Sequence, residues 1–384
     1  MLRVNHPDHK QMFLRRFCYS KERVVTDRFG SYTIKYQLLG GLVKFKTYSW
    51  GGWRLSILGI SVLSKKTGTF KFFGVSIYKN YNNGWLDRIQ IRIGMEYDDV
   101  YIIRHSLGES YVQLMHLGEA IKVNKSKKPV LILWSEKHAE FYQMFLPAGM
   151  DMISIDLRQR DINTVFDKKT PVIWHNGQRF ICRIPWIVPK MKELLATGTQ
   201  VNFYDYINEC AGVVKGKTPV LPKPSTEASR RVTTKISRIK LSDKFIILCP
   251  ETHSLMPLEE IFWENLEEGL RQKGYDIFVN VHENEPFLKN AKSTKMTIEE
   301  MFILAQQSSG IISLGSGLAV FLTAAGVKMD LLYTNTAGNL ETSEFILQLY
   351  SVHHIPGVSR ALVKEYDTSK LNGQNLVEII LERY

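Results

Sequence analysis

The sequence predicts an α/β protein with two Rossmann-like, doubly wound domains that face a cleft, preceded by a β-rich extension. Three observations support this prediction. From Asp98 onward, apolar runs of strand length alternate with helical periodicity, which is typical of βαβ units and parallel sheets. A proline-rich, basic stretch interrupts the alternation near its middle. The chain has 384 residues, whereas one hydrophobic core rarely grows beyond about 250.

These features divide the chain into four predicted segments. Residues 1–96 form the extension, 97–214 the first Rossmann-like domain, 215–243 a linker and 244–384 the second Rossmann-like domain. Sheets of this kind bind ligands at the carboxyl ends of their strands, where the strand order reverses. The cleft between the two domains is therefore the expected site.

The extension contains a degenerate repeat and most of the net charge. Apolar runs interrupted by glycine recur at 38–43, 57–62 and 72–77, which predicts β-hairpins with bulges or close backbone approach. Residues 1–95 contain 17 Lys and Arg against 4 Asp and Glu, a balance of +13 in a chain of formal charge +12. Interleaved aromatic residues predict an aromatic, basic face; they are Tyr48, Trp50, Trp53, Phe70, Phe72 and Tyr78.

Two interpretations of this extension stay open. It is either an add-on that packs on the main body, or a docking surface for an anionic membrane or for a substrate. The first 20 residues lack the apolar centre of a signal peptide, and no apolar run approaches the roughly 18 residues of a membrane span. The four cysteines have neither metal-ligand spacing nor disulfide density. These observations predict a cytoplasmic protein, with peripheral attachment to the inner face of the membrane as an added possibility.

The most informative segment is a Gly/Ser turn between an apolar strand, 311–313, and a helix of small and apolar residues. The turn comprises Gly315, Ser316, Gly317 and Leu318. Backbone amides at such a helix start suit a diphosphate, because the unpaired donors and the helix dipole both favour an anion. The alternative is a tight turn in which Ser316 is simply the N-cap. If the turn binds a nucleotide, we expect Gly317→Val to abolish binding and leave the fold intact.

With this turn, the second half resembles the heptosyltransferase-like family of bacterial glycosyltransferases, which have the GT-B fold of twin Rossmann domains. Strand 245–249 is followed by Thr252 and His253, and strand 276–281 by His282 and Glu283. The resemblance implies that these loops and the turn at 316–318 bind the phosphates, ribose and base of a nucleotide-sugar donor, with Glu283 on the ribose.

The first half resembles the family more weakly. There, a strand is followed by Leu107-Gly108-Glu109, where the family usually has Gly-Asp with the acidic residue as candidate base. Two departures, Gly315 and the pair Ala319-Val320, replace an acidic residue and a histidine that help to bind the donor in heptosyltransferases. The departures weigh against ADP-heptose as the donor. The N-terminal repeats are similar to leading segments of capsule and O-antigen glycosyltransferases.

Glycosyl transfer requires a base for the acceptor hydroxyl and donors that stabilise the leaving diphosphate. Glu109 is the first candidate base, although an acidic residue also suits a helix N-terminus. His105 is the alternative base. Arg230 or Arg231 could reach the leaving group from the linker. Because no Asp-x-Asp triplet occurs, no metal site is expected, and no cofactor is expected beyond the nucleotide sugar.

The sequence thus predicts a glycosyltransferase that moves a sugar from a nucleotide-sugar donor to a bacterial surface polysaccharide acceptor, itself lipid-linked. A second enzymatic interpretation is a polysaccharide pyruvyl transferase on the same scaffold, because a fold does not determine its chemistry. A third is a non-catalytic module that binds a membrane or nucleic acid through the basic extension. No nucleic-acid recognition motif accompanies that charge, so no nucleic-acid partner is expected.

Overall fold

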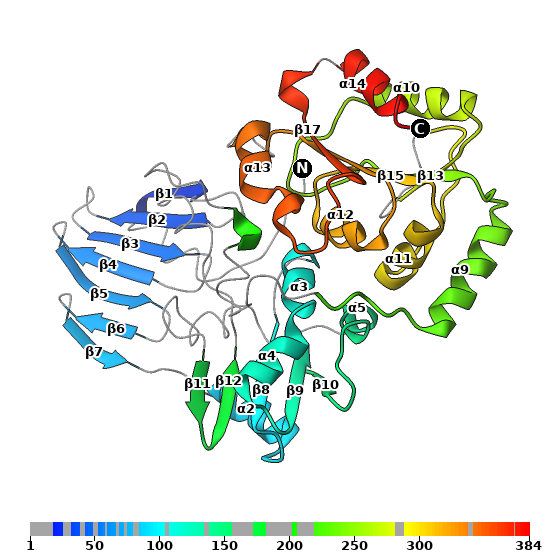
Figure 1. The fold of residues 1–384 in the computed structure, drawn as a ribbon. Coiled ribbons are helices and arrows are strands. Elements are labelled where there is room, and N and C mark those ends of the chain that lie inside the picture. Colours follow the sequence, from blue (N-terminus) through cyan, green and yellow to red (C-terminus); the bar gives the residue numbers. More distant parts are fainter. Residues whose placement is uncertain are drawn as a thin grey trace. The chain divides into compact units, whose positions relative to one another are not determined.

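The protein is described by a computed structural model (Figure 1). It describes residues 18–25, 32–38, 43–48, 53–57, 60–66, 69–72, 75–79, 84–103, 107–133, 138–155, 172–181, 202–205, 219–280, 288–336, 341–371 and 373–384. The chain divides into two compact units, one with Met1–Ile91 and Leu157–Asp167, the other with Arg92–Asp156 and Lys168–Tyr384.

The first unit contains a seven-stranded antiparallel sheet in which each strand pairs with the next along the chain. The strands are β1 (Cys18–Val25), β2 (Tyr32–Leu38), β3 (Val43–Tyr48), β4 (Trp53–Ile57), β5 (Ile60–Lys66), β6 (Thr69–Phe72) and β7 (Val75–Lys79). Each glycine-containing repeat spans the end of one strand and the start of the next. Irregular register occurs instead within strands, for example between Leu55 and Ser56 and between Phe70 and Lys71.

The second unit contains two further sheets. The first has the order β10-β9-β8-β12-β11, and only its edge strand β11 is antiparallel. Its elements are β8 (Asp99–Ile102), β9 (Pro129–Leu133), β10 (Asp151–Ser154), β11 (Val172–His175) and β12 (Gln178–Ile181), with helices α3 (Leu107–Leu114), α4 (Leu117–Asn124) and α5 (Ala139–Gln143); α2 (Gly84–Ile93) precedes them. The strand order reverses between β8 and β12, which makes their carboxyl ends the switch point of this sheet.

The other sheet is entirely parallel, with the order β14-β13-β15-β16-β17. Its strands are β13 (Phe245–Cys249), β14 (Asp276–Val279), β15 (Gly310–Leu314), β16 (Met329–Tyr333) and β17 (Val363–Asp367). This is the doubly wound order 2-1-3-4-5, with its switch point between β13 and β15. The predicted α/β class with two Rossmann-like sheets is therefore confirmed.

Helices cover both faces of the parallel sheet, because its strands are apolar at successive positions. The helices of this half are α9 (Thr226–Arg238), α10 (Glu260–Gln272), α11 (Ile298–Gln307), α12 (Gly317–Leu322), α13 (Ser343–Tyr350) and α14 (Gly373–Leu381), with 3-10 turns η3 (Thr323–Ala325), η4 (Val352–His354) and η5 (Thr368–Lys370). Ile246 and Leu248 pack with residues of α10 and α14. Ile247 packs in a second buried cluster with residues of α11 and α12, and that cluster continues into the first sheet.

After β8 the chain forms two helices, α3 and α4, because it turns at Met115 and His116. One predicted segment differs from the structure. The segment 215–243, predicted as a linker, contains the 13-residue helix α9, whose N-cap Ser225 accepts a hydrogen bond from the Ala228 amide at 3.1 Å. The apolar residues Ala228 and Val232 of α9 are buried in the shared core, so this part of the segment is structured.

Candidate functional site

Within the second unit, the switch points of its two sheets lie close together. The turn after β8 leads into α3 and the turn after β15 leads into α12, and these two helices pack against each other. A Cβ placed on Gly317 would lie 3.0 Å from the Gly108 amide nitrogen and 3.3 Å from Leu107 Cβ. The glycines at the starts of α3 and α12 thus permit direct backbone contact between the two halves.

The Gly/Ser turn adopts the conformation expected of a helix start. Ser316 is extended, with φ −151°, and its Oγ accepts a hydrogen bond from the Ala319 amide at 3.1 Å. The N-cap alternative is therefore correct for the side chain of Ser316. The amides of Gly317 and Leu318 precede the first intrahelical hydrogen bonds, so they remain the donors available to an anion.

Gly315 is required by packing. A Cβ at this position would lie 2.9 Å from Cε1 of Tyr333 and 3.3 Å from Cδ1 of Leu255. The Tyr333 hydroxyl donates to Glu365 Oε1 at 2.8 Å, which fixes the ring against the turn. The heptosyltransferase-like family often has an acidic residue at this position, and such a side chain would collide with the Tyr333 ring here.

The loop after β13 meets the same turn. Thr252 Oγ1 lies 3.5 Å from the Gly315 carbonyl oxygen, and the imidazole of His253 is exposed. The loop is anchored further along, where the Met256 amide donates to the Asn335 carbonyl at 2.7 Å. Thr252, Gly315, Ser316 and Gly317 are thus brought together at the β13–β15 switch point.

Glu109 lies in the first turn of α3, next to the Gly108 that contacts α12. The candidate base and the Gly/Ser turn are therefore neighbours across the two halves. The other predicted residues His105, His282 and Glu283 lie outside the described residues.

A buried polar cluster beside this site was missed by the sequence analysis. Glu365 of β17 accepts hydrogen bonds from the Tyr333 hydroxyl, the Val352 amide and the Ser351 hydroxyl. Burial raises the pKa of Tyr204 well above its usual range, and the nearby Tyr350, Glu109 and Glu365 raise it further. The only sequence signal of Tyr204 is an aromatic residue in a polar stretch, which is too common to identify a site.

Arg230 and Arg231 do not extend toward the switch points. The Arg231 guanidinium donates to Glu300 at 2.8 Å and lies 3.4 Å from Glu140, while Arg230 contacts Glu227 on the exposed surface of α9. The prediction that one of them reaches the leaving group is wrong for this conformation, because Arg231 is held by acidic residues of α11 and α5.

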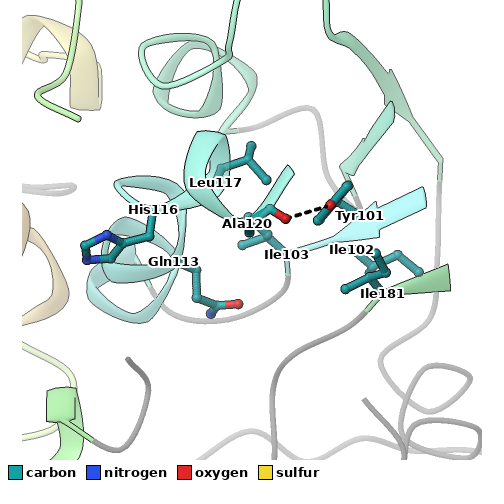
Figure 2. Close-up of a pocket in the computed structure, with 8 residues that line it drawn as sticks. All are labelled: Tyr101, Ile102, Ile103, Gln113, His116, Leu117, Ala120 and Ile181. Atoms are coloured by element: carbon teal, nitrogen blue, oxygen red, sulfur yellow. Dashed lines mark hydrogen bonds between the residues drawn. The ribbon is translucent and has the colours of Figure 1, made fainter. Parts of the chain in front are cut away.

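A cavity of about 30 Å³ lies between the first sheet and the helices α3 and α4. Figure 2 shows its lining, which is Tyr101, Ile102, Ile103, Gln113, His116, Leu117, Ala120 and Ile181. Since one water requires about 10–15 Å³ by this measure, the cavity has room for a water molecule or two and is too small for a sugar.

His116 is the unusual residue of that lining. It is 3% exposed, and its Nε2 is buried without a hydrogen-bond partner. Burial lowers its pKa, although Glu119 opposes the shift. In Figure 2 the ring points away from Tyr101 and Ile103.

Two general features complete the description. In the part of the chain that the structure describes, no three His, Cys, Asp or Glu residues are grouped to hold a metal ion. No described helix combines the length and apolar character needed to cross a membrane.

The chain is similar in structure to several known proteins. Bacterial iron-containing dodecameric glycosyltransferase TibC from enterotoxigenic E. coli shares 14% identity over 74% of this chain and 76% of that chain, with a TM-score of 0.43. The glycosyl transferase family 9 protein of Veillonella parvula shares 11% sequence identity over 75% of this chain and 98% of that chain, with a TM-score of 0.47. E. coli ADP-heptose LPS heptosyltransferase II shares 10% sequence identity over 74% of this chain and 99% of that chain, with a TM-score of 0.49.

No protein-family model matches the chain, and no curated protein matches it by sequence. The function of this chain is therefore inferred from its own residues.

Proposed function

We propose that this protein is a glycosyltransferase of the GT-B type, which transfers a sugar from a nucleotide-sugar donor to a saccharide acceptor. One observation carries the proposal: the switch-point turns of two Rossmann-like sheets meet, with Glu109 on one side and the turn Gly315–Leu318 on the other. Switch points are where such sheets bind ligands, and a group-transfer reaction needs both substrates at one place.

The residues divide between the two halves of the reaction. Glu109 accepts the proton of the acceptor hydroxyl as that oxygen attacks the anomeric carbon, and the bond from this carbon to the diphosphate breaks. The amides of Gly317 and Leu318 and the hydroxyl of Thr252 stabilise the negative charge on the departing nucleoside diphosphate. His253 and, outside the described residues, His282 and Glu283 are proposed to contact the nucleoside.

The acceptor is proposed to be a bacterial surface polysaccharide, such as a capsule or O-antigen precursor, carried on a lipid. The support is the balance of +13 in residues 1–95, because a basic segment attracts a protein to an anionic membrane surface. The protein would then work in the cytoplasm, on the inner face of the membrane, with no cofactor beyond the nucleotide sugar.

Thermal stabilisation by nucleotides tests the donor assignment. UDP, GDP, ADP and CMP are titrated separately, and one should raise the unfolding temperature, since a ligand at 100 times its Kd adds about 2.7 kcal/mol. The matching nucleotide sugar should then release nucleoside diphosphate in the presence of a saccharide acceptor, with the rate retained in EDTA. Absence of stabilisation by every nucleotide would remove the proposal.

A further inference from the structure

The seven-stranded sheet has two chemically different faces, which follow from the pairing register of its strands. Successive residues of a strand alternate between the faces, so residues paired across neighbouring strands share a face. One row of pairs runs Tyr36–Phe45–Leu55–Leu63–Phe72–Val75 through β2 to β7. Trp53, Phe70 and Tyr78 belong to a second row on that same face.

The adjacent row lies on the opposite face and is basic. It runs Glu22–Lys35–Lys46–Arg54–Ser64–Lys71–Ser76 through β1 to β7. Lys44, Lys66 and Lys79 occupy other positions of this face. We call this the basic face. The predicted aromatic, basic face is therefore present only in part: Tyr48 shares the basic face and Lys65 pairs with Trp53 and Phe70, but the register places the other paired aromatic residues opposite the basic row. Trp50 lies outside the described residues.

Repulsion between the like charges of the basic row destabilises the isolated sheet. Lys35 pairs with Lys46, and Lys46 pairs with Arg54. Neighbouring strands lie about 5 Å apart, which is well inside the Debye length of about 8 Å at physiological salt. Like charges directly opposite each other destabilise a sheet. Arg54, whose side chain the structure describes, is exposed, so this part of the row is open to an external anion.

We propose that the basic face docks on an anionic lipid bilayer. Its seven basic residues are distributed over β2 to β7 with one acidic residue, Glu22, at the edge, and an array extended in two dimensions matches a charged plane. Single-stranded nucleic acid requires aromatic stacking platforms, but among the paired aromatic residues of β2–β7 only Tyr48 shares the basic face. The attachment is therefore electrostatic.

This inference deepens the membrane association in the proposed function, and a pair of matched variants tests it. Lys35→Gln/Lys46→Gln/Arg54→Gln removes three charges from the basic face. Lys21→Gln/Arg23→Gln/Lys65→Gln removes three from the opposite face of the same sheet. Both full-length variants have the same net charge, so only the face differs. Far-UV circular dichroism and thermal unfolding verify that each variant is folded.

Sedimentation uses vesicles of phosphatidylcholine with 30% phosphatidylglycerol, prepared at about 0.1 M salt. The basic-face variant should partition about 100-fold more weakly than the unmodified protein, since each Lys or Arg contributes about 1 kcal/mol. The partitioning of the opposite-face variant to the same vesicles should change by less than about threefold, because its three charges lie on the other side of the sheet. Equal losses in both variants, equal binding to pure phosphatidylcholine, or displacement by a single-stranded oligonucleotide at equal phosphate concentration would overturn the proposal.

Measuring nucleotide binding in the basic-face variant separates this test from the test of the proposed function. The basic-face variant should retain the stabilisation by nucleotide seen in the unmodified protein, because the Gly315–Leu318 turn belongs to the other unit. If no nucleotide binds but the vesicle results hold, the transferase proposal fails and the docking face stands.

Discussion

Small residues determine what can meet at the proposed site. Gly108 and Gly317 allow α3 and α12 to touch through their backbones, and Gly315 leaves room for the Tyr333 ring. Gly317→Val, expected from the sequence to leave the fold intact, would instead place a branched side chain against the Gly108 amide. A clean test of nucleotide binding must therefore avoid this position, and Thr252→Ala is better suited because Thr252 is only loosely bonded.

Glu109 carries the catalytic prediction. Glu109→Gln preserves size and removes the basic carboxylate, so turnover should fall about 100-fold or more while the stabilisation by nucleotide is retained. Steady-state assays with saturating donor measure this. Glu378→Gln, on the exposed surface of α14, is the matched control and should keep full turnover. Near-normal turnover in Glu109→Gln would move the role to another group, with His105 as the next candidate.

His116 should make stability depend on pH. Its folded-state pKa lies below the unfolded value of about 6.5. The unfolded chain therefore binds the extra proton first, and stability falls as pH drops below that value until the folded-state pKa is passed. Urea unfolding of His116→Gln between pH 7 and 5 should show a shallower loss than the unmodified protein.

The exposed residue His253 supplies the control for this measurement. His253→Gln is measured through the same pH range, to separate the effect of the buried ring of His116 from that of replacing an exposed histidine by glutamine. Parallel curves for all three proteins would show that His116 does not contribute.

At the scale of elements, α9 is attached to α11 by a charged cluster. Glu300, 1% exposed at its side chain, binds Lys235 at 2.6 Å, Arg231 at 2.8 Å and the Thr297 amide at 2.8 Å in a capping box. Burial alone would raise the pKa of Glu300, but these partners together lower it. The cluster therefore stabilises the fold at neutral pH, and this contribution is lost as pH falls through the lowered pKa.

Glu300→Gln should destabilise the protein by about 1.5–3 kcal/mol at pH 7, the range for hydrogen bonds to charged groups. The difference from the unmodified protein should begin to shrink as pH falls below the unfolded pKa of about 4.5, and it is lost as pH passes through the lower pKa of the folded protein. Glu227→Gln breaks the exposed pair with Arg230 and should cost less than about 1 kcal/mol. Chemical unfolding at pH 7 and pH 4 measures both; equal effects of the two substitutions would show that burial of the cluster contributes nothing.

At the scale of the second unit, the two sheets share one hydrophobic core. Phe321 of α12 is fully buried, and its ring centroid lies 5.1 Å from Phe141 and 5.6 Å from Tyr111, both of the first half. It also lies 5.1 Å from Phe302 of α11. The helix that begins at the Gly/Ser turn therefore also joins the two halves.

This shared core predicts one cooperative unfolding transition for both sheets. Phe321→Ala should cost about 3–5 kcal/mol and lower amide protection in β9 and β13 together. Leu270→Ala is the discriminating variant, because Leu270 belongs to a cluster made only of second-half residues. Hydrogen exchange should show that β9 loses protection in this variant as well. A β9 strand that stays protected would mean that the halves unfold separately.

The sequence by itself determined the local elements of the two α/β halves. Strand 245–249 was predicted at its observed bounds, and the N-cap role of Ser316 was one of the two interpretations of the Gly/Ser turn. These features depend on periodicity and on hydrogen bonds between residues close in sequence, which a single stretch of chain encodes.

Only the tertiary structure decided which of these elements meet. It placed most of the paired aromatic residues of the N-terminal sheet on the face opposite the basic row, because a strand's register depends on its partner strand. It showed that Arg231 is held by Glu300 and that the Tyr333 hydroxyl donates to Glu365. Such pairs are distant in sequence, and their contact follows from how the shared core packs, so no local pattern could have predicted them.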